Sequence, residues 1–238
     1  MYPLGKQFEQ NIKKAKSDEK CIIKGEKYRF TMLSERLIRL EYSETGHFVD
    51  NPSQLVLYRS FDYPNYQVKQ DPKFLEITTK YFRLMYVKEM PFTGSKVDPM
   101  KNLKITLLSS VNENENRDWY YGHPEARNMG GNMVSEDVPL SQYLKRGLYS
   151  LEGFASIDDS NSFLFLEDGT LENREKGSVD IYVFMYNKDF PAALSDYFKL
   201  TGRPSLIPRY AIGNWWSRNT TYDTEKAMDI VSHFERRK

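Results

Sequence analysis

Apolar and polar residues alternate from Lys20 to Arg59, and the alternation continues in shorter runs as far as Leu108. The pattern is clear in Tyr28–Met32 and Leu37–Tyr42, and the run Ser43–Gly46 interrupts it as a turn. A period of two broken by turn residues is typical of β-strands, and short strands at this spacing favour a β-sandwich. Further strands are predicted by the same alternation at 74–79, 81–87, 105–108, 154–157, 163–166 and 179–185.

The stretch from Asn112 to Arg146 differs from its surroundings. It is polar, rich in Gly and Asn, and holds neither a period of two nor one of about 3.6. The pattern predicts a long loop or a group of linked turns. Loops of this length inside a compact domain are often functional, and a disordered excursion is the alternative.

The period changes to that of a helix only after Tyr186. Phe190, Leu194, Tyr197 and Phe198 fall on one helical face, with Pro191 near the start and Gly202 past the end; these are standard start and stop signals. A connector rich in proline then follows.

A short apolar run, Tyr210–Trp216, predicts a new strand after the connector. Beyond it, Thr224–Phe234 is amphipathic, and Thr221 or Asp223 can serve as its N-cap. A strand followed by a helix, with no second strand to pair with, is half of a βαβ unit.

Composition narrows the class of partner. The 34 Lys and Arg balance 33 Asp and Glu, so no strong field attracts nucleic acid or an anionic membrane. The 17 Tyr, 14 Phe and 3 Trp suit strands and core packing first, and also stacking against sugar rings. With one cysteine, no apolar leader and no apolar run of membrane length, we expect a soluble cytoplasmic protein.

Familiar catalytic motifs are absent from the sequence. It contains no Gly-x-Ser-x-Gly, no phosphate-binding glycine-rich loop and no histidine pair at metal-ligand spacing. His47, His123 and His233 lie far apart and are interpreted as solvated or packed residues. The adjacent Asp158 and Asp159 are interpreted as structural. Neighbouring strand residues point to opposite faces, and in a turn an Asp side chain hydrogen-bonds nearby backbone groups. No cofactor and no metal site is expected.

Three blocks of sequence resemble glycoside hydrolase family 31, the α-glucosidase and α-xylosidase family. G-L-Y-S-L-E-G-F-A-S-I-D-D-S at 147–160 is similar to a family block reading G-L-L-S-R-D-G-W-A-x-x-D-D-S. T-G-R-P-S-L-I-P-R-Y-A-I-G at 201–213 resembles the stretch that leads into the family's barrel, and N-M-G-G at 128–131 resembles its N-L-G-G. The segment 119–125 departs from the family's Y-G-x-G-E.

The resemblance implies a mainly β fold. It consists of a galactose-mutarotase-like β-sandwich, or supersandwich, followed by the first β-strand and α-helix of a truncated TIM barrel. The expected boundaries are 1–186 for the sandwich, 187–209 for a helix and connector, and 210–238 for the incomplete barrel.

The resemblance also implies a retaining α-glycosidase, in which one carboxylate attacks the sugar and another protonates the leaving oxygen. Both would lie beyond Lys238, so no catalytic residue is assigned and this chain alone is expected to be inactive. The substrate-binding residues implied by the resemblance are Asp137, Asn132, Trp215, Trp216 and Arg218, with Glu136 as a further hydroxyl partner of the sugar.

Two other classes of protein remain open from sequence. A stand-alone carbohydrate-binding β-sandwich would use the aromatic strands and would need no carboxylates, and a purely structural domain would bind no glycan. An α-glycoside or oligosaccharide is the expected partner. Self-association through the exposed barrel fragment is expected as well, because an open strand edge beside apolar side chains invites pairing.

Overall fold

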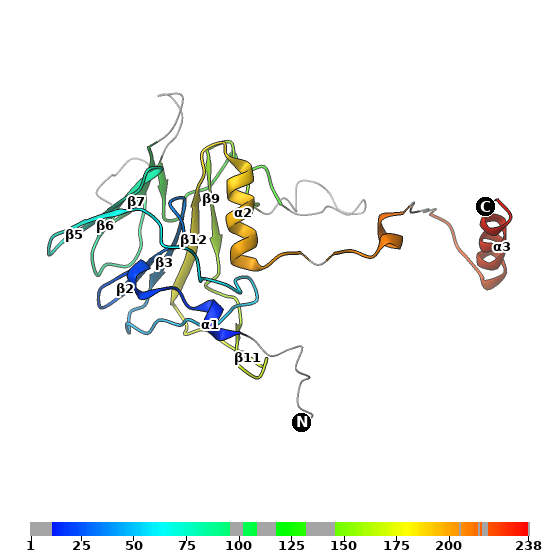
Figure 1. Ribbon diagram of the computed structural model, residues 1–238, viewed down its shortest axis with the longest axis horizontal. Coiled ribbons are helices and arrows are strands. Elements are labelled where there is room, and N and C mark those ends of the chain that lie inside the picture. Colours follow the sequence, from blue (N-terminus) through cyan, green and yellow to red (C-terminus); the bar gives the residue numbers. More distant parts are fainter. Residues whose placement is uncertain are drawn as a thin grey trace. The chain divides into compact units, whose positions relative to one another are not determined.

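The computed structural model describes residues 11–95, 102–108, 118–131, 146–204, 206–213, 215 and 219–237. The chain divides into two compact units, Met1–Arg203 and Pro204–Lys238. Figure 1 shows the sheets and helix α2 of the first unit and helix α3 of the second. Each unit is described by itself.

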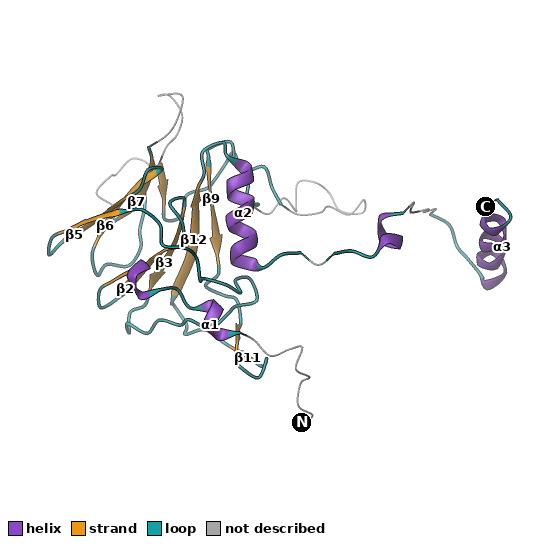
Figure 2. Cartoon of the chain, in the orientation of Figure 1, coloured by secondary structure: helices purple, strands orange, loops and turns teal. Residues whose placement is uncertain are grey.

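The first unit is mainly β (Figure 2). Its short helices are α1 (Ile12–Ala15) and the 3₁₀ turn η2 (Glu19–Cys21), and its one longer helix among the described residues is α2 (Phe190–Thr201). Its strands are β1 (Ile22–Lys24), β2 (Tyr28–Met32), β3 (Leu37–Tyr42), β4 (Gln67–Gln70), β5 (Phe74–Thr78), β6 (Phe82–Val87), β7 (Leu103–Leu107), β8 (Asp118–Tyr120), β9 (Phe154–Asp158), β10 (Leu164–Phe165), β11 (Leu171–Glu172) and β12 (Val179–Met185).

Two five-stranded antiparallel sheets account for most of these strands. The first has the order β1-β2-β3-β12-β9, and the second has the order β4-β5-β6-β7-β8. In the first sheet β12 lies between β3 and β9, with Val183 opposite both Ile38 and Ser156. Strands 140 residues apart in sequence therefore meet at its centre, and β10 and β11 form a separate small hairpin.

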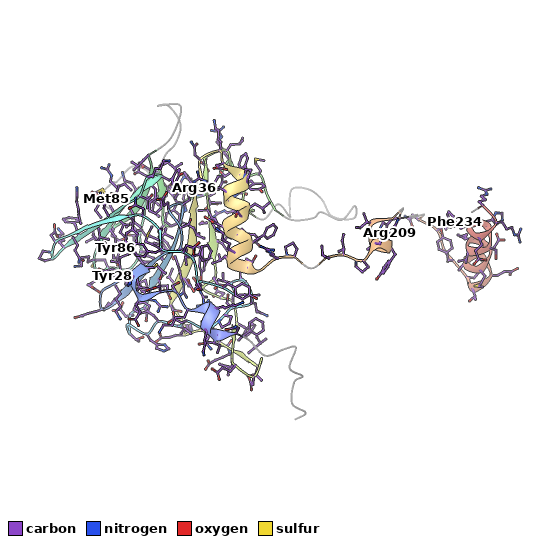
Figure 3. All side chains as sticks on the ribbon, in the orientation of Figure 1. Tyr28, Arg36, Met85, Tyr86, Arg209 and Phe234 are labelled. Atoms are coloured by element: carbon purple, nitrogen blue, oxygen red, sulfur yellow. The ribbon has the colours of Figure 1, made fainter. Side chains whose placement is uncertain are left out.

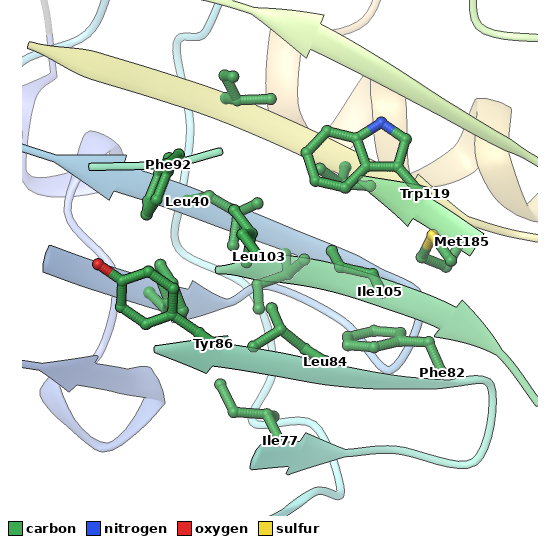
Figure 4. Close-up of a cluster of buried hydrophobic side chains, with 14 of the residues drawn as sticks. Leu40, Ile77, Phe82, Leu84, Tyr86, Phe92, Leu103, Ile105, Trp119 and Met185 are labelled. Atoms are coloured by element: carbon green, nitrogen blue, oxygen red, sulfur yellow. The ribbon is translucent and has the colours of Figure 1, made fainter. Parts of the chain in front are cut away.

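Apolar side chains from both sheets fill the space between them (Figure 4). From the first sheet Leu40 and Met185 enter this core, and from the second Leu84, Ile105 and Trp119 do so. On β6 the burial alternates, so that Tyr86 is 1% exposed and its neighbour Met85 is 45% exposed (Figure 3). The second sheet thus has one buried face, and the predicted β-sandwich is confirmed.

The first sheet is covered on its other face as well. Along β12, Ile181 and Val183 belong to the core between the sheets, whereas Tyr182 and Phe184 pack with Ala193 and Leu200 of α2. A sheet covered on both faces leaves no strand position open to solvent, so β2 and β3 are buried at every position, including the charged Arg29, Arg39 and Glu41.

Local signals fix both ends of α2 as the sequence predicted. The Asp189 side chain accepts a hydrogen bond from the Ala192 N–H at 3.2 Å, and Pro191 stands in the first turn. Gly202 ends the helix at φ +92°, a value that favours glycine. Arg36, from the turn between β2 and β3, pairs with Asp189 at 2.7 Å and ties the helix to the sheet (Figure 3).

The predicted loop 112–146 is partly wrong. Residues Asp118–Tyr120 form β8, the edge strand of the second sheet, where Trp119 pairs with Ile105. The polar neighbours of Trp119 hid this strand from pattern reading, because only its middle residue enters the core. Within the rest of that segment, residues 121–131 form turns at 121–122 and 126–127 and no regular helix or strand.

In the second unit, the predicted strand at Tyr210–Trp216 is wrong for the residues described. Arg209–Ile212 form a 3₁₀ turn, η4, in which the Ala211 N–H donates to Pro208 O at 2.9 Å. A strand needs a neighbour to accept and donate its backbone hydrogen bonds, and local turns satisfy these groups here. The predicted helix is confirmed as α3 (Thr224–Glu235), capped by the Asp223 carboxylate.

None of the helices among the described residues is long and apolar enough to cross a membrane.

Candidate functional site

Asn128 joins the two stretches of chain that flank residues 132–145 in sequence. Its Oδ1 accepts hydrogen bonds from the Gly130 N–H at 2.9 Å and from the Gly147 N–H at 2.8 Å. Its Nδ2 donates to Gly147 O at 2.9 Å, and its backbone pairs with Ser150. We call this arrangement of Asn128, Gly130 and Gly147 the Asn128 clamp.

The clamp requires glycine at its crossing point. A Cβ on Gly131 would lie 2.7 Å from the Cα of Gly147, and a Cβ on Gly147 would collide with the carbonyl of Gly130. No side chain fits between two backbones at this separation. The N-M-G-G block and the first residue of the 147–160 block are thus in direct contact.

Glu125 connects the clamp to the first sheet. Its Oε1 accepts hydrogen bonds from both the backbone N–H, at 3.0 Å, and the hydroxyl of Ser156 on β9, and its Oε2 accepts one from Asn128 at 3.3 Å. The residue is 2% exposed and has a backbone φ of +46°, which non-glycine residues rarely adopt. Burial raises the pKa of its carboxyl group, and the Ser156 hydrogen bonds oppose this rise without cancelling it.

His123 is a packed histidine, as the sequence indicated. Its Nδ1 accepts a hydrogen bond from the Glu125 N–H at 2.9 Å, so a neutral ring carries its proton on Nε2. The ring packs edge-on against Tyr120 and Phe154, with centroid distances of 4.7 and 5.1 Å. Its Nε2 lies 4.0 Å from the Glu152 carboxylate.

Tyr186, which follows β12, anchors the other side of the clamp. Its hydroxyl accepts a hydrogen bond from the Ser150 N–H at 2.6 Å and donates one to Leu148 O at 2.9 Å. Burial raises the pKa of this hydroxyl, which therefore stays protonated and able to donate. Residues 148–150 are held to the end of a central strand by one buried side chain.

A network of buried ion pairs lies in the first sheet near the start of β12, at the opposite end of that strand from Tyr186. Arg39 contacts Asp180 at 2.7 Å and Glu41 at 3.0 Å, and Arg174 contacts Asp159 at 2.6 Å and Asp180 at 3.0 Å. Burial raises the pKa of Asp180, but the Arg39 and Arg174 charges outweigh it and hold that pKa well below its usual range. Buried carboxylates matched in this way by arginines serve structure.

The adjacent Asp158 and Asp159 do not act as a pair. Asp159 is fully buried and accepts a hydrogen bond from the Ser53 hydroxyl at 2.7 Å, whereas the Asp158 side chain is exposed and accepts one from the Ser160 N–H. The structural interpretation of these two residues is confirmed.

Most of the substrate-binding residues implied by the resemblance lie outside the described residues: Asn132, Asp137, Trp216 and Arg218 all do, as does Glu136. Trp215 is described; it lies in the second unit, is 75% exposed and donates from Nε1 to Ala211 O at 2.8 Å. The grouping of these five residues therefore stays a prediction.

The sequence did not predict an individual role for Glu125 or for Asn128. Asn128 stood inside a recognised block, but its spacing gave no hint that it would hold Gly147. In the part of the chain that is described, no group of three or more His, Cys, Asp or Glu side chains is placed to hold a metal ion.

The similarity of this chain to known proteins is to solved structures. No family model matches the chain, and no curated protein matches it. Among solved structures, two of a GH31 dextranase from Flavobacterium johnsoniae resemble it. The one complexed with glucose has 19% sequence identity and a TM-score of 0.48, and the mutant complexed with isomaltotriose has 18% identity and the same TM-score. Each match covers 89% of this chain and 30% of the dextranase, so the chain spans less than a third of that protein's length.

Proposed function

We propose that the chain is the N-terminal part of a retaining α-glycosidase that acts on α-linked glucosides or xylosides. In this proposal the sandwich supports a catalytic barrel, and residues 132–145 contribute to the sugar pocket. The catalytic carboxylates belong to a part of the protein beyond Lys238.

The observation that carries the proposal is the Asn128 clamp. The blocks 128–131 and 147–160 were matched to glycoside hydrolase family 31 separately, from sequence. One asparagine side chain hydrogen-bonds the backbone of both, at 2.9 and 2.8 Å. A segment whose two ends are fixed on a rigid sheet can present polar side chains at a defined place, as substrate-binding loops do.

The clamp suits the roles that we propose for the loop. Asn132 and Asp137 follow the clamp and would hydrogen-bond sugar hydroxyls, while Trp215, Trp216 and Arg218 would shape the pocket at the end of the first barrel strand. These residues act in binding only.

Three buried carboxylates of the first unit are already engaged within the fold. A retaining pair needs two carboxyl groups about 5–5.5 Å apart that are free to attack and to protonate. Asp159 and Asp180 are buried and ion-paired to Arg174, and Glu125 is fully buried among hydrogen bonds. None of the three is available to a sugar.

The test compares two lengths of the protein. The 238-residue chain should release no nitrophenol from aryl α-glucosides or α-xylosides, whereas the protein in the length that its natural reading frame encodes should release it. Hydrolysis by the short chain, or none by the natural-length protein, contradicts the proposal.

Substitution at the clamp tests the role of the loop. In the natural-length protein Asn128→Ala should lower kcat/KM about tenfold, since both loop ends lose their anchor, which corresponds to about 1.4 kcal/mol. The matched control is Asn51→Ala, because Asn51 also donates one side-chain hydrogen bond to a backbone carbonyl, that of Phe165 at 3.0 Å, and lies outside the clamp. Equal activity of the two variants would contradict the role that we give the loop.

A further inference from the structure

A cavity of about 840 Å³ opens on the first unit, away from the Asn128 clamp. It lies between the turn that joins β2 to β3, the segment 58–65 and the C-terminal end of α2, and it shares no residue with the clamp. Leu33 and Pro64 are its buried apolar residues. The volume falls in the range of roughly 300–1,000 Å³ that small-molecule sites occupy.

Three aromatic side chains line this cavity, namely Tyr58, Phe61 and Tyr63. Tyr63 is 61% exposed and leans against the Tyr66 ring at 5.7 Å, so one of its faces is supported while much of the ring stays open. An aromatic residue that is held in place yet exposed is unusual in a monomer surface and offers a flat apolar face to a ligand.

Polar side chains that can still form hydrogen bonds surround these rings. Glu35, Asp62 and Arg203 line the cavity, and within the described part of the chain none of their side chains makes a hydrogen bond or ion pair. Lys14 lies over the Tyr58 ring at 6.0 Å and adds a second cation. The cavity thus presents both acceptors and donors beside the aromatic faces.

The charges of the cavity nearly cancel. Glu35 and Asp62 oppose Lys14 and Arg203, and the remaining cation, Lys199, is already paired with Asp196 at 3.4 Å. A phosphate or carboxylate ligand would find no excess of positive charge, and a cation no excess of negative charge. The chemistry favours a neutral ligand that has many hydroxyl groups and one apolar face.

We propose that this cavity is a saccharide-binding site, separate from the loop that the Asn128 clamp holds. A pyranose ring would stack its C–H face on Tyr63 or Phe61, and its hydroxyls would bond to Glu35, Asp62 and Arg203. The site would bind neutral oligosaccharides. This inference goes beyond the proposed glycosidase function and does not need it.

The test is a titration of the 238-residue chain with maltotriose and with isomaltotriose, followed by amide chemical shifts. At least one of the two should give saturable shifts at residues 33–36, 58–65 and 199–203. Tyr63→Ala should weaken binding at least tenfold. Phe74→Ala, which removes a partly exposed aromatic side chain from β5 of the other sheet, should change it less than twofold.

Three results would overturn the inference. The first is that neither trisaccharide gives a saturable shift, and the second is that the shifts are confined to residues 121–131 and 146–153. The third is that glucose 6-phosphate or glucuronate binds ten times more tightly than glucose, which would indicate an anion site. Because Tyr63 is exposed, its variant should keep the amide spectrum of the folded chain. Binding here together with inactivity of the natural-length protein would uphold this site and refute the glycosidase assignment, and the reverse pair of results would do the opposite.

Discussion

Replacing Arg39 by methionine tests whether the buried ion pairs hold the first sheet together. Arg39 is 1% exposed and donates to Asp180 at 2.8 and 2.7 Å and to the Val49 carbonyl at 3.1 Å. Methionine keeps much of the side-chain volume and removes the charge. Asp180 then keeps only Arg174, and Glu41 keeps only Arg29.

The expected loss is large because two carboxylates stay buried without their shared partner. Removing one member of a buried ion pair costs about 3–5 kcal/mol, a substantial part of the roughly 5–15 kcal/mol that stabilises a domain. In urea this should lower the unfolding midpoint by at least about 1 M.

The loss of stability should also depend on pH, because the pKa of Asp180 differs between the folded and the unfolded chain. The arginines hold the pKa of Asp180 below the value of about 3.9 that it has when unfolded, so this carboxylate stabilises the fold above that pH and stops doing so as pH falls through its folded pKa. Without Arg39 its pKa rises. The difference between the native chain and Arg39→Met should therefore be greatest near pH 7 and shrink toward pH 4.

Urea unfolding followed by far-ultraviolet circular dichroism measures this directly. The control is Lys104→Met, because Lys104 pairs with Asp118 at 3.5 Å while both side chains are partly exposed, and such a pair contributes about 0–1 kcal/mol. If Arg39→Met lost no more stability than this control, or if its deficit grew as pH fell, the reasoning about the buried network would be wrong.

Three further predictions concern other parts of the chain. Asn128→Ala should speed amide exchange of the two glycines that it contacts about 5–30-fold, equivalent to about 1–2 kcal/mol of lost hydrogen bonding, and Asn51→Ala should leave those amides unchanged. Glu125→Gln should gain stability relative to the native chain as pH rises from 4 to 7, because burial raises the pKa of Glu125 and ionisation then costs the folded state; identical pH profiles in thermal unfolding would contradict this. The 238-residue chain should self-associate with rising concentration through exposed side chains such as Trp215, whereas a chain ending at Arg203 should sediment as a monomer; monomeric behaviour of both would rule out this surface.

The elements that sequence predicted best are those specified by neighbouring residues. Helix α2 has its cap and its proline at one end and its terminal glycine at the other, and α3 has Asp223 as its cap. Strands β3 and β12 carry apolar residues wherever they face the core between the sheets. In contrast, β4 is polar at three of its four positions and becomes a strand only by pairing with β5, which pattern reading does not see.

The candidate site was less accessible to prediction, for the same reason. Glu125 is buried because Ser156, 31 positions later, donates two hydrogen bonds to it, and neither residue signals the other in sequence. The saccharide cavity draws Glu35, Tyr63 and Arg203 from three distant segments. The resemblance identified the blocks around the clamp, whereas the contact between them appears only once the chain is folded.

The edge strand β4 has a consequence for how the protein behaves at high concentration. It ends the order of the second sheet, and all four of its side chains are exposed. Its outward backbone groups are a template on which another chain could add a strand, but the charge of Lys69 makes that template poor. Resistance to fibril growth from this side of the sandwich therefore depends on Lys69, and an apolar replacement there would do more harm to solubility than to folding.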